Sequence, residues 1–236
     1  MPADRALIRA LRAALLAGAD PARAADQQRY MKSALPFYGL SKPQLGVAVR
    51  AVLADPAYRI TDRATWEATI RALWDEVTHR EEWYAALLLA QHRHYRAWRD
   101  GDAMPLWRHL VVTGAWWDVV DETATHLVRE ALVRDPAREG IRLREWAIDD
   151  DLWLRRAAII CQVGLRDGLD EDLLTDAIEP NLADRDFFVR KGIGWALRDH
   201  ARVAPAWVRE FVDAHADTLS PLSRREATKH LVGVDA

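Results

Sequence analysis

The sequence predicts an all-α protein made of stacked helix pairs, and three observations support this fold class. Helix-favouring residues dominate a chain of 236 residues that is 50% hydrophobic and 29% charged. No segment alternates apolar and polar residues for long enough to indicate a sheet. Aromatic anchors also recur, because Trp83, Trp117, Trp153 and Phe188 are separated by 34, 36 and 35 residues. Two helices fit into each interval, so we expect a HEAT-like repeat α-solenoid, a curved superhelix of antiparallel helix pairs.

Capping residues and prolines set the expected helix boundaries. Ser41 and Gln44 have the spacing of a capping box, and Ser220 precedes a proline at a first helical position. Further expected N-caps are Asp62, Asp150 or Asp151, and Asp186. We predict helices near residues 3–17, 22–34, 42–54, 62–79, 81–98, 104–113, 116–132, 136–148, 151–166, 170–182, 186–202, 205–215 and 221–232. No Gly/Ser-rich or Pro-rich linker interrupts this series, which predicts a single domain over residues 1–236.

Composition excludes several classes of protein. The balance of apolar and charged residues excludes a disordered or collagen-like chain, and the longest apolar run, residues 83–90, is too short to span a bilayer. Leu7, Ile8, Leu11 and Leu15 recur at helical spacing, which favours an amphipathic helix over a signal peptide. Cys161 is the only cysteine, so no intrachain disulfide can form. We therefore expect a cytoplasmic protein.

Charge is distributed unevenly along the chain although the net charge is only −3. Residues 170–179 carry five acidic side chains and no basic one, whereas residues 153–166 carry three arginines and no acid. Alternate helices of a solenoid line its inner and outer walls, so this alternation predicts a basic concave wall that binds anions. Solvated helix faces without any partner are the equally weighted alternative.

The segment Trp116–Asp121 (WWDVVD) is the densest candidate for a functional site. On a helix, Trp117 and Asp121 lie four residues apart on one face, and Val119 and Val120 can point into the core. A carboxylate beside an indole suits a cationic ligand. The structural alternative is that the aspartate favours the helix dipole and the tryptophans fill the core.

Other motifs give little support to metal, nucleotide or serine-hydrolase chemistry. His92 and His94 lie two residues apart in a predicted helix, about 200° around its axis, so we expect that they cannot share a metal ion. Gly192 and Gly194 fall inside a helical pattern and do not form a phosphate loop. The sequence contains no HExxH, CxxC or GxSxG pattern.

Five motifs in order along the chain resemble the AlkD-type DNA alkylation repair glycosylases, which are all-helical proteins of HEAT-like repeats. These motifs are RYMKS (29–33) with FYG (37–39) and Pro43, WWDVVD (116–121), WLRRAAI (153–159), FFVRKGIGW (187–195) and LSPLSRREA (219–227). They cover nearly the whole chain. One departure is that Gln44 and Leu45 follow Pro43, where family members often carry arginines.

The resemblance implies excision of N3- or N7-alkylated purines from double-stranded DNA by a monomer that needs no metal or other cofactor. It implies that Asp121 is the catalytic carboxylate, that Trp117 and Trp195 flank the lesion, and that Arg156 faces the DNA. We further expect DNA binding by Tyr30, Lys32, Arg190, Lys191, Arg224 and Arg225. The equally weighted alternative for Arg224, Arg225 and Lys229 is the surface of a capping helix. The resemblance also implies use of the protein at the nucleoid.

The chemistry of the lesion agrees with this assignment. An N3- or N7-alkylpurine is already cationic and leaves as a neutral base, so positive charge builds on the sugar as the glycosidic bond breaks. A carboxylate can stabilise that charge and position water, and indole faces add cation–π attraction. The alternative function is a HEAT-like scaffold that binds DNA or a protein without chemistry. Asp121 argues against the scaffold, because an acidic side chain facing phosphates would repel them.

Overall fold

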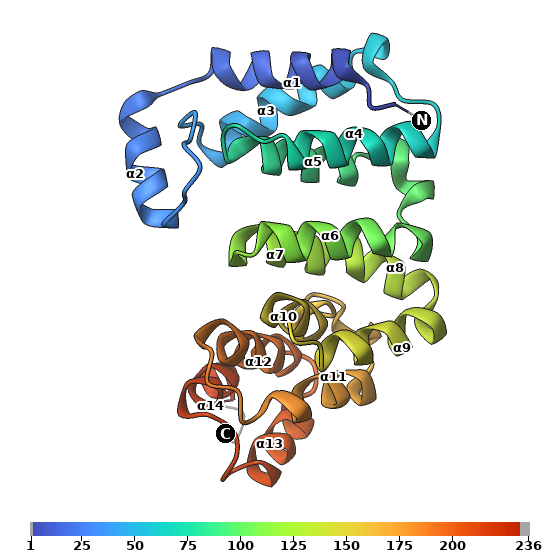
Figure 1. Cartoon of the computed structure of the whole chain (residues 1–236). Coiled ribbons are helices and arrows are strands. Elements are labelled where there is room, and N and C mark those ends of the chain that lie inside the picture. Colours follow the sequence, from blue (N-terminus) through green and yellow to red (C-terminus); the bar gives the residue numbers. More distant parts are fainter. Residues whose placement is uncertain (1, 232–236) are drawn as a thin grey trace. The chain divides into compact units, whose positions relative to one another are not determined.

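The computed structural model describes residues 2–231, and all of the regular structure in that range is helical (Figure 1). The α-helices are α1 Arg5–Ala17, α2 Pro21–Met31, α3 Lys42–Ala54, α4 Arg63–Asp75, α5 Glu81–Gln91, α6 Met104–Gly114, α7 Trp117–Glu122, α8 Arg129–Arg134, α9 Pro136–Ala147, α10 Leu152–Ile160, α11 Glu171–Ile178, α12 Phe187–His200, α13 Pro205–Ala214 and α14 Pro221–Ala227. A π-helical segment, η4, covers Thr123–Val128. Short 3₁₀ helices are η1 Pro56–Tyr58, η2 Arg93–Trp98, η3 Gly101–Ala103, η5 Arg166–Gly168, η6 Glu179–Asn181 and η7 Thr228–His230. The all-α prediction is confirmed.

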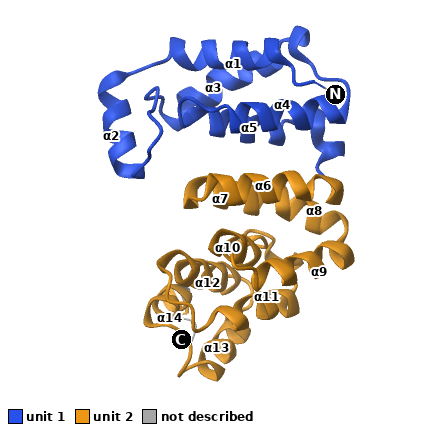
Figure 2. Cartoon of the chain, in the orientation of Figure 1, with its two compact units in different colours: residues 1–99 blue, residues 100–236 orange. Residues whose placement is uncertain are grey.

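Two compact units make up the chain, residues 1–99 and residues 100–236 (Figure 2). The expectation of a single domain over residues 1–236, and of one continuous superhelix, stays a prediction. None of the helices within residues 2–231 is long and apolar enough to cross a membrane.

The first unit is formed by helices that pack in pairs. Helix α1 packs on α3, and α4 packs on α5. The amphipathic pattern expected at the N-terminus is confirmed, because Leu7, Ile8, Leu11 and Leu15 are all buried against these neighbours. Burial of such a stripe stabilises a surface helix far more than its intrinsic propensity does.

The segment after α2 is held by a buried carboxylate at the start of α5. Glu81, only 1% exposed, accepts hydrogen bonds from the backbone N–H groups of Tyr38, Gly39 and Leu40 at 2.9, 2.7 and 3.2 Å. Gly39 has a φ of +96°, and a Cβ there would lie 2.1 Å from the carbonyl oxygen of Asp20. Only glycine fits such a position, so the FYG motif is a structural element of this unit.

The second unit continues the pairing of helices. Helix α10 packs on α9 and α12, α11 packs on α9, and α12 packs closely on α14. The expected aromatic anchors lie near helix starts: Trp83 in α5, Trp117 in α7, Trp153 in α10 and Phe188 in α12. The prediction of two helices per interval is thus confirmed for these segments.

Most of the expected helix starts are confirmed by their caps. Ser41 and Gln44 form the capping box of α3. Asp62, Asp151 and Asp186 accept hydrogen bonds from the first backbone N–H groups of α4, α10 and α12, and Ser220 caps α14. The choice between Asp150 and Asp151 is therefore resolved in favour of Asp151.

Helix ends and one helix interior differ from the prediction. The expected helix 81–98 stops at Gln91, and the expected α-helix 116–132 contains the π-helical segment η4 directly after α7. Thr123 and Thr125 donate side-chain hydrogen bonds to the carbonyl oxygens of Val119 and Asp121, each at 2.7 Å. Such back-bonding competes with the backbone N–H groups that an α-helix would use, which accounts for the widened turn.

Candidate active site

Helix α7 places Asp121 at the surface of the second unit beside an indole. Val119 and Val120 are fully buried, as expected, and fix the orientation of this short helix. Trp117 and Asp121 are four residues apart and project from the same face. The Asp121 side chain is 17% exposed, so its carboxylate can be reached from solvent.

Arg156 of α10 holds this carboxylate in a two-pronged ion pair. Its Nε donates to Oδ1 of Asp121 and its Nη2 donates to Oδ2, both at 2.8 Å. Its remaining nitrogen, Nη1, donates to the carbonyl oxygen of Phe188 in α12. A guanidinium used in this way fixes both the position and the plane of a carboxylate. One side chain therefore ties together α7, α10 and α12 at Asp121.

The ion pair leaves Asp121 with capacity for another partner. An ionised carboxylate offers about four acceptor sites, and Arg156 occupies one on each oxygen. Burial raises the pKa of Asp121, and the nearby Asp118 and Glu122 raise it further, while the hydrogen bonds and charge of Arg156 oppose these effects. A raised pKa makes Asp121 a stronger base than a free aspartate, and its remaining lone pairs can accept a proton or face a cation.

The sequence-based expectation for Arg156 was contact with DNA, and the structure assigns this side chain a partner within the protein. Arg156 is only 5% exposed, and all three of its guanidinium nitrogens donate within the chain. Contact between Arg156 and DNA stays a prediction. Its observed geometry is that of a residue that positions Asp121.

Three aromatic rings near the starts of α7, α10 and α12 pack together. Trp116, Trp153 and Phe188 lie with ring centroids 5.0 to 6.1 Å apart in tilted and edge-to-face arrangements, which are favourable for aromatic pairs. Trp116 is therefore the ring that packs on the repeat anchors Trp153 and Phe188. Trp117 shares a helix face with Asp121 instead. Helical spacing correctly placed Trp117 with Asp121, but the repeat alignment did not identify Trp116 as the ring that packs on Trp153 and Phe188.

One face of α12 completes the surroundings of Arg156. Phe188, Gly192 and Trp195 follow one another at intervals of four and three residues, so they lie along one face. A Cβ at Gly192 would lie 3.3 Å from Nη1 of Arg156. Gly192 thus gives the guanidinium room, and the half-buried Trp195 projects from the same side of the helix.

The predicted DNA-binding residues of the second unit lie on α12 and on the adjoining helix α14. Lys191 pairs with Glu226 of α14 at 3.1 Å, and the Nε of Arg190 donates to the carbonyl oxygen of Asp186 at 3.3 Å. Arg224 donates to the carbonyl oxygen of Ala216, and Arg225 is exposed. Their roles toward DNA stay predictions.

Tyr30 and Lys32 lie at the end of α2 in the first unit. Tyr30 is 76% exposed, and Lys32 adopts a left-handed conformation as the C-cap of the helix. Both side chains are accessible for binding, as the prediction requires. Their contact with DNA stays a prediction.

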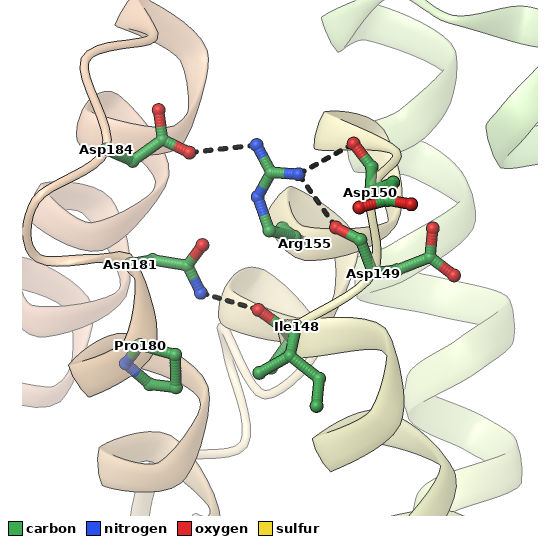
Figure 3. Close-up of a pocket in the computed structure, with 8 residues that line it drawn as sticks. Ile148, Asp149, Asp150, Arg155, Pro180, Asn181 and Asp184 are labelled. Atoms are coloured by element: carbon green, nitrogen blue, oxygen red, sulfur yellow. Dashed lines mark hydrogen bonds and ion pairs between the residues drawn. The ribbon is translucent and has the colours of Figure 1, made fainter.

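A separate pocket of about 350 Å³ lies between the C-terminal ends of α9 and α11 (Figure 3). Arg155 crosses it, donating to the carbonyl oxygens of Asp149 and Asp150 and to the carboxylate of Asp184 at 2.8 to 2.9 Å. Its lining has three aspartates against one arginine and does not include Asp121. An acidic surface of this kind disfavours phosphate, so we interpret it as a junction between successive repeats.

One expectation about histidines was wrong. His92 and His94 were expected on opposite sides of a helix, but α5 ends before them and their rings stack 4.8 Å apart at 10°. The cause is the extended backbone at His92, which replaces helical geometry. Among residues 2–231, no group of three or more His, Cys, Asp or Glu side chains is arranged to hold a metal ion.

Sequence reasoning did not identify the pairing of Asp121 with Arg156, although a signal for it exists. The two residues are 35 residues apart, which is close to the repeat interval, so they lie within one position of equivalent places in successive helix pairs. An acid and a base one period apart on neighbouring helices are well placed to pair. The contribution of the Phe188 carbonyl has no signal in the sequence, because every residue carries one.

Comparison with known proteins identifies the family of this chain. The family model described as "DNA alkylation repair enzyme" matches residues 11–231. A solved structure titled "Predicted DNA alkylation repair enzyme from Enterococcus faecalis" is similar to this chain, with a TM-score of 0.80 and 27% sequence identity over 91% of this chain and 97% of that one. No curated protein matches. Because the family model spans nearly all of the sequence, the chain belongs to the DNA alkylation repair enzyme family.

Proposed function

We propose that this protein is a DNA glycosylase that excises N3- and N7-alkylated purines from duplex DNA by hydrolysing the N-glycosidic bond. The observation that carries the proposal is the Asp121 carboxylate, which is fixed on both oxygens by Arg156 yet still partly exposed beside Trp117. A structural ion pair alone would not require an accessible carboxylate. Membership of a DNA repair family supports DNA as the substrate.

The reaction needs stabilisation of positive charge more than it needs an acid. As the bond between C1′ and the purine nitrogen breaks, its electron pair neutralises the cationic base, and the sugar acquires oxocarbenium character. Asp121 would face this sugar, where a fixed negative charge lowers the energy of the transition state without reorganising. Because Arg156 holds the Asp121 carboxylate in place, its negative charge is already oriented before the bond breaks.

Water then completes the hydrolysis. Its oxygen forms the new bond to C1′, and its proton passes to the Asp121 carboxylate and from there to solvent. The raised pKa of Asp121 favours this transfer. The indoles of Trp117 and Trp195 would attract the positive charge on the sugar and the alkylated base through their ring faces.

Base release from methylated duplex DNA tests the proposal. The intact protein is incubated with duplex DNA carrying 3-methyladenine and 7-methylguanine, and free bases are quantified by chromatography against unmethylated duplex and a no-protein control. We expect release of free methylated purine well above the spontaneous rate, and none from unmethylated duplex. Duplex binding without base release would refute the enzyme and leave the non-catalytic scaffold as the function.

A further inference from the structure

Glu226 is a buried carboxylate that is surrounded by three cations at the contact between α12 and α14. It is 5% exposed, and its Oε1 lies 3.1 Å from Nζ of Lys191 and 2.7 Å from Nζ of Lys229. Its Oε2 accepts from Arg198. Hydrogen bonds from Lys229 and Lys191 lower the pKa of Glu226 to about 2. The carboxylate is therefore ionised at every physiological pH.

The geometry forces two ammonium groups into close proximity at the surface. Both contact the same oxygen, so their nitrogens are at most 5.8 Å apart, the two distances taken end to end. Lys191 and Lys229 nevertheless keep 37% and 48% of their side-chain exposure. Each ammonium carries three N–H donors, and Glu226 uses one from each. The remaining donors are available to an anion from solvent.

Charge at this cluster favours an anion. One carboxylate faces two ammonium groups and one guanidinium, so the cluster has a net charge of two positive units. Without Glu226 the two ammonium groups would repel each other and separate, because like charges at such a distance are unfavourable. Glu226 thus keeps the two ammonium groups close enough together for two oxygens of one phosphate to contact both of them.

The cluster is also close to the candidate active site along the chain. Lys191 precedes Trp195 by four residues in α12, which is one turn and roughly 6 Å along the helix. Gly194 allows α14 to approach, because a Cβ there would lie 2.5 Å from Cβ of Glu226. A phosphate held by Lys191 would therefore belong to the DNA backbone next to the nucleotide that Trp195 is proposed to contact.

We propose that Lys191 and Lys229 form a phosphate clamp for the DNA backbone and that Glu226 is its positioning residue. The inference rests on the proposed action on duplex DNA. It makes a prediction opposite to simple electrostatics, because removing the negative charge of Glu226 should weaken the binding of a polyanion.

The test compares Glu226→Gln with Glu130→Gln by the affinity for duplex DNA over 50 to 200 mM salt. Glu130 pairs with Arg134 in α8, away from the clamp, so both variants raise the net charge equally. Each phosphate contact contributes about −0.9 to the slope of log affinity against log salt, or roughly a threefold change across this range. We expect Glu226→Gln to bind at least threefold more weakly than Glu130→Gln at 50 mM salt. The difference should shrink toward 200 mM, because the salt slope of Glu226→Gln is smaller by about one. Equal or tighter binding with an unchanged slope would overturn the clamp.

A second set of variants keeps the test valid if Glu226→Gln fails to fold. Lys191→Ala and Lys229→Ala should each reduce the slope of log affinity against log salt by the same amount. The double variant should reduce this slope little further, because both side chains bind one phosphate. Additive losses would contradict a shared phosphate. DNA binding and base release are measured in separate assays. If the variants show the expected binding effects but the native protein releases no base, only the glycosylase proposal is refuted. Base release by a protein that lacks these binding effects would refute only the clamp.

Discussion

Replacing Arg156 with alanine would leave the Asp121 carboxylate without the partner that holds both of its oxygens. Removing one member of a buried ion pair typically costs about 3–5 kcal/mol if the other charge remains. Asp121 can avoid part of that cost by taking up a proton. From its ordinary pKa of 3.8, protonation at pH 7 costs about 4 kcal/mol, since each pKa unit is worth about 1.36 kcal/mol. The two costs are comparable, so losing Arg156 raises the pKa of this carboxyl group further and favours its protonated form.

This reasoning predicts a change in the pH dependence of base release. Catalysis requires ionised Asp121, so the rate falls as pH drops through the pKa of that group. Burial already raises this pKa in the native protein, and losing Arg156 removes the effect that opposes the rise. We expect the acid limb of Arg156→Ala to move to higher pH than in the native protein, with at least a tenfold lower rate at pH 7 and partial recovery at pH 8.5.

Single-turnover base release between pH 5.5 and 8.5, with duplex affinity measured in parallel, checks this prediction. Affinity should change by only a few fold, because Arg156 is buried. Arg155→Ala is the matched control: its guanidinium binds Asp184 and the carbonyls of Asp149 and Asp150, so the acid limb should stay in place. A large loss of affinity with an unchanged pH profile would refute the positioning role and favour the DNA contact that the family resemblance implies.

Two further predictions concern rings and a turn. Trp117→Ala and Trp195→Ala should each slow base release by about 2- to 30-fold, which corresponds to a cation–π contribution of roughly 0.5–2 kcal/mol. Phenylalanine in either place should restore part of the rate. A single-turnover rate within twofold of the native protein would exclude that ring from the site. Gly39→Ala should destabilise the first unit by about 2 kcal/mol or more, because its φ is +96° and the new Cβ would meet the carbonyl oxygen of Asp20. Thermal unfolding measures this loss, and an unchanged melting curve would show that the segment relaxes without cost.

Much of the fold follows from local signals in the sequence. The capping box at Ser41 and the apolar spacing of α1 were sufficient to place those helices, because both depend on residues within one or two turns. The π-helical segment after α7 was missed, since its threonines are compatible with an ordinary helix. The stacking of His92 on His94 was missed because it depends on where α5 ends.

The candidate site was predicted less completely than the fold. Asp121 and Trp117 could be placed together because helical spacing determines which residues share a face. The role of Arg156 was missed. Its pairing with Asp121 shows in the sequence only as a spacing close to the repeat interval, and its contact with the Phe188 carbonyl has no sequence signal. Glu226 was missed for the same reason, since its three cations come from two separate segments.

The most direct measurement of the central claim is base release by Asp121→Asn beside the native protein on the same methylated duplex. Asparagine keeps the shape of the side chain but removes its charge, so the stabilisation of the sugar is lost while backbone phosphates are repelled less. We predict a release rate about a hundredfold lower, equivalent to roughly 3 kcal/mol, with duplex affinity unchanged or tighter. A variant that binds the duplex and releases methylated purine at the native rate would contradict the assignment of Asp121.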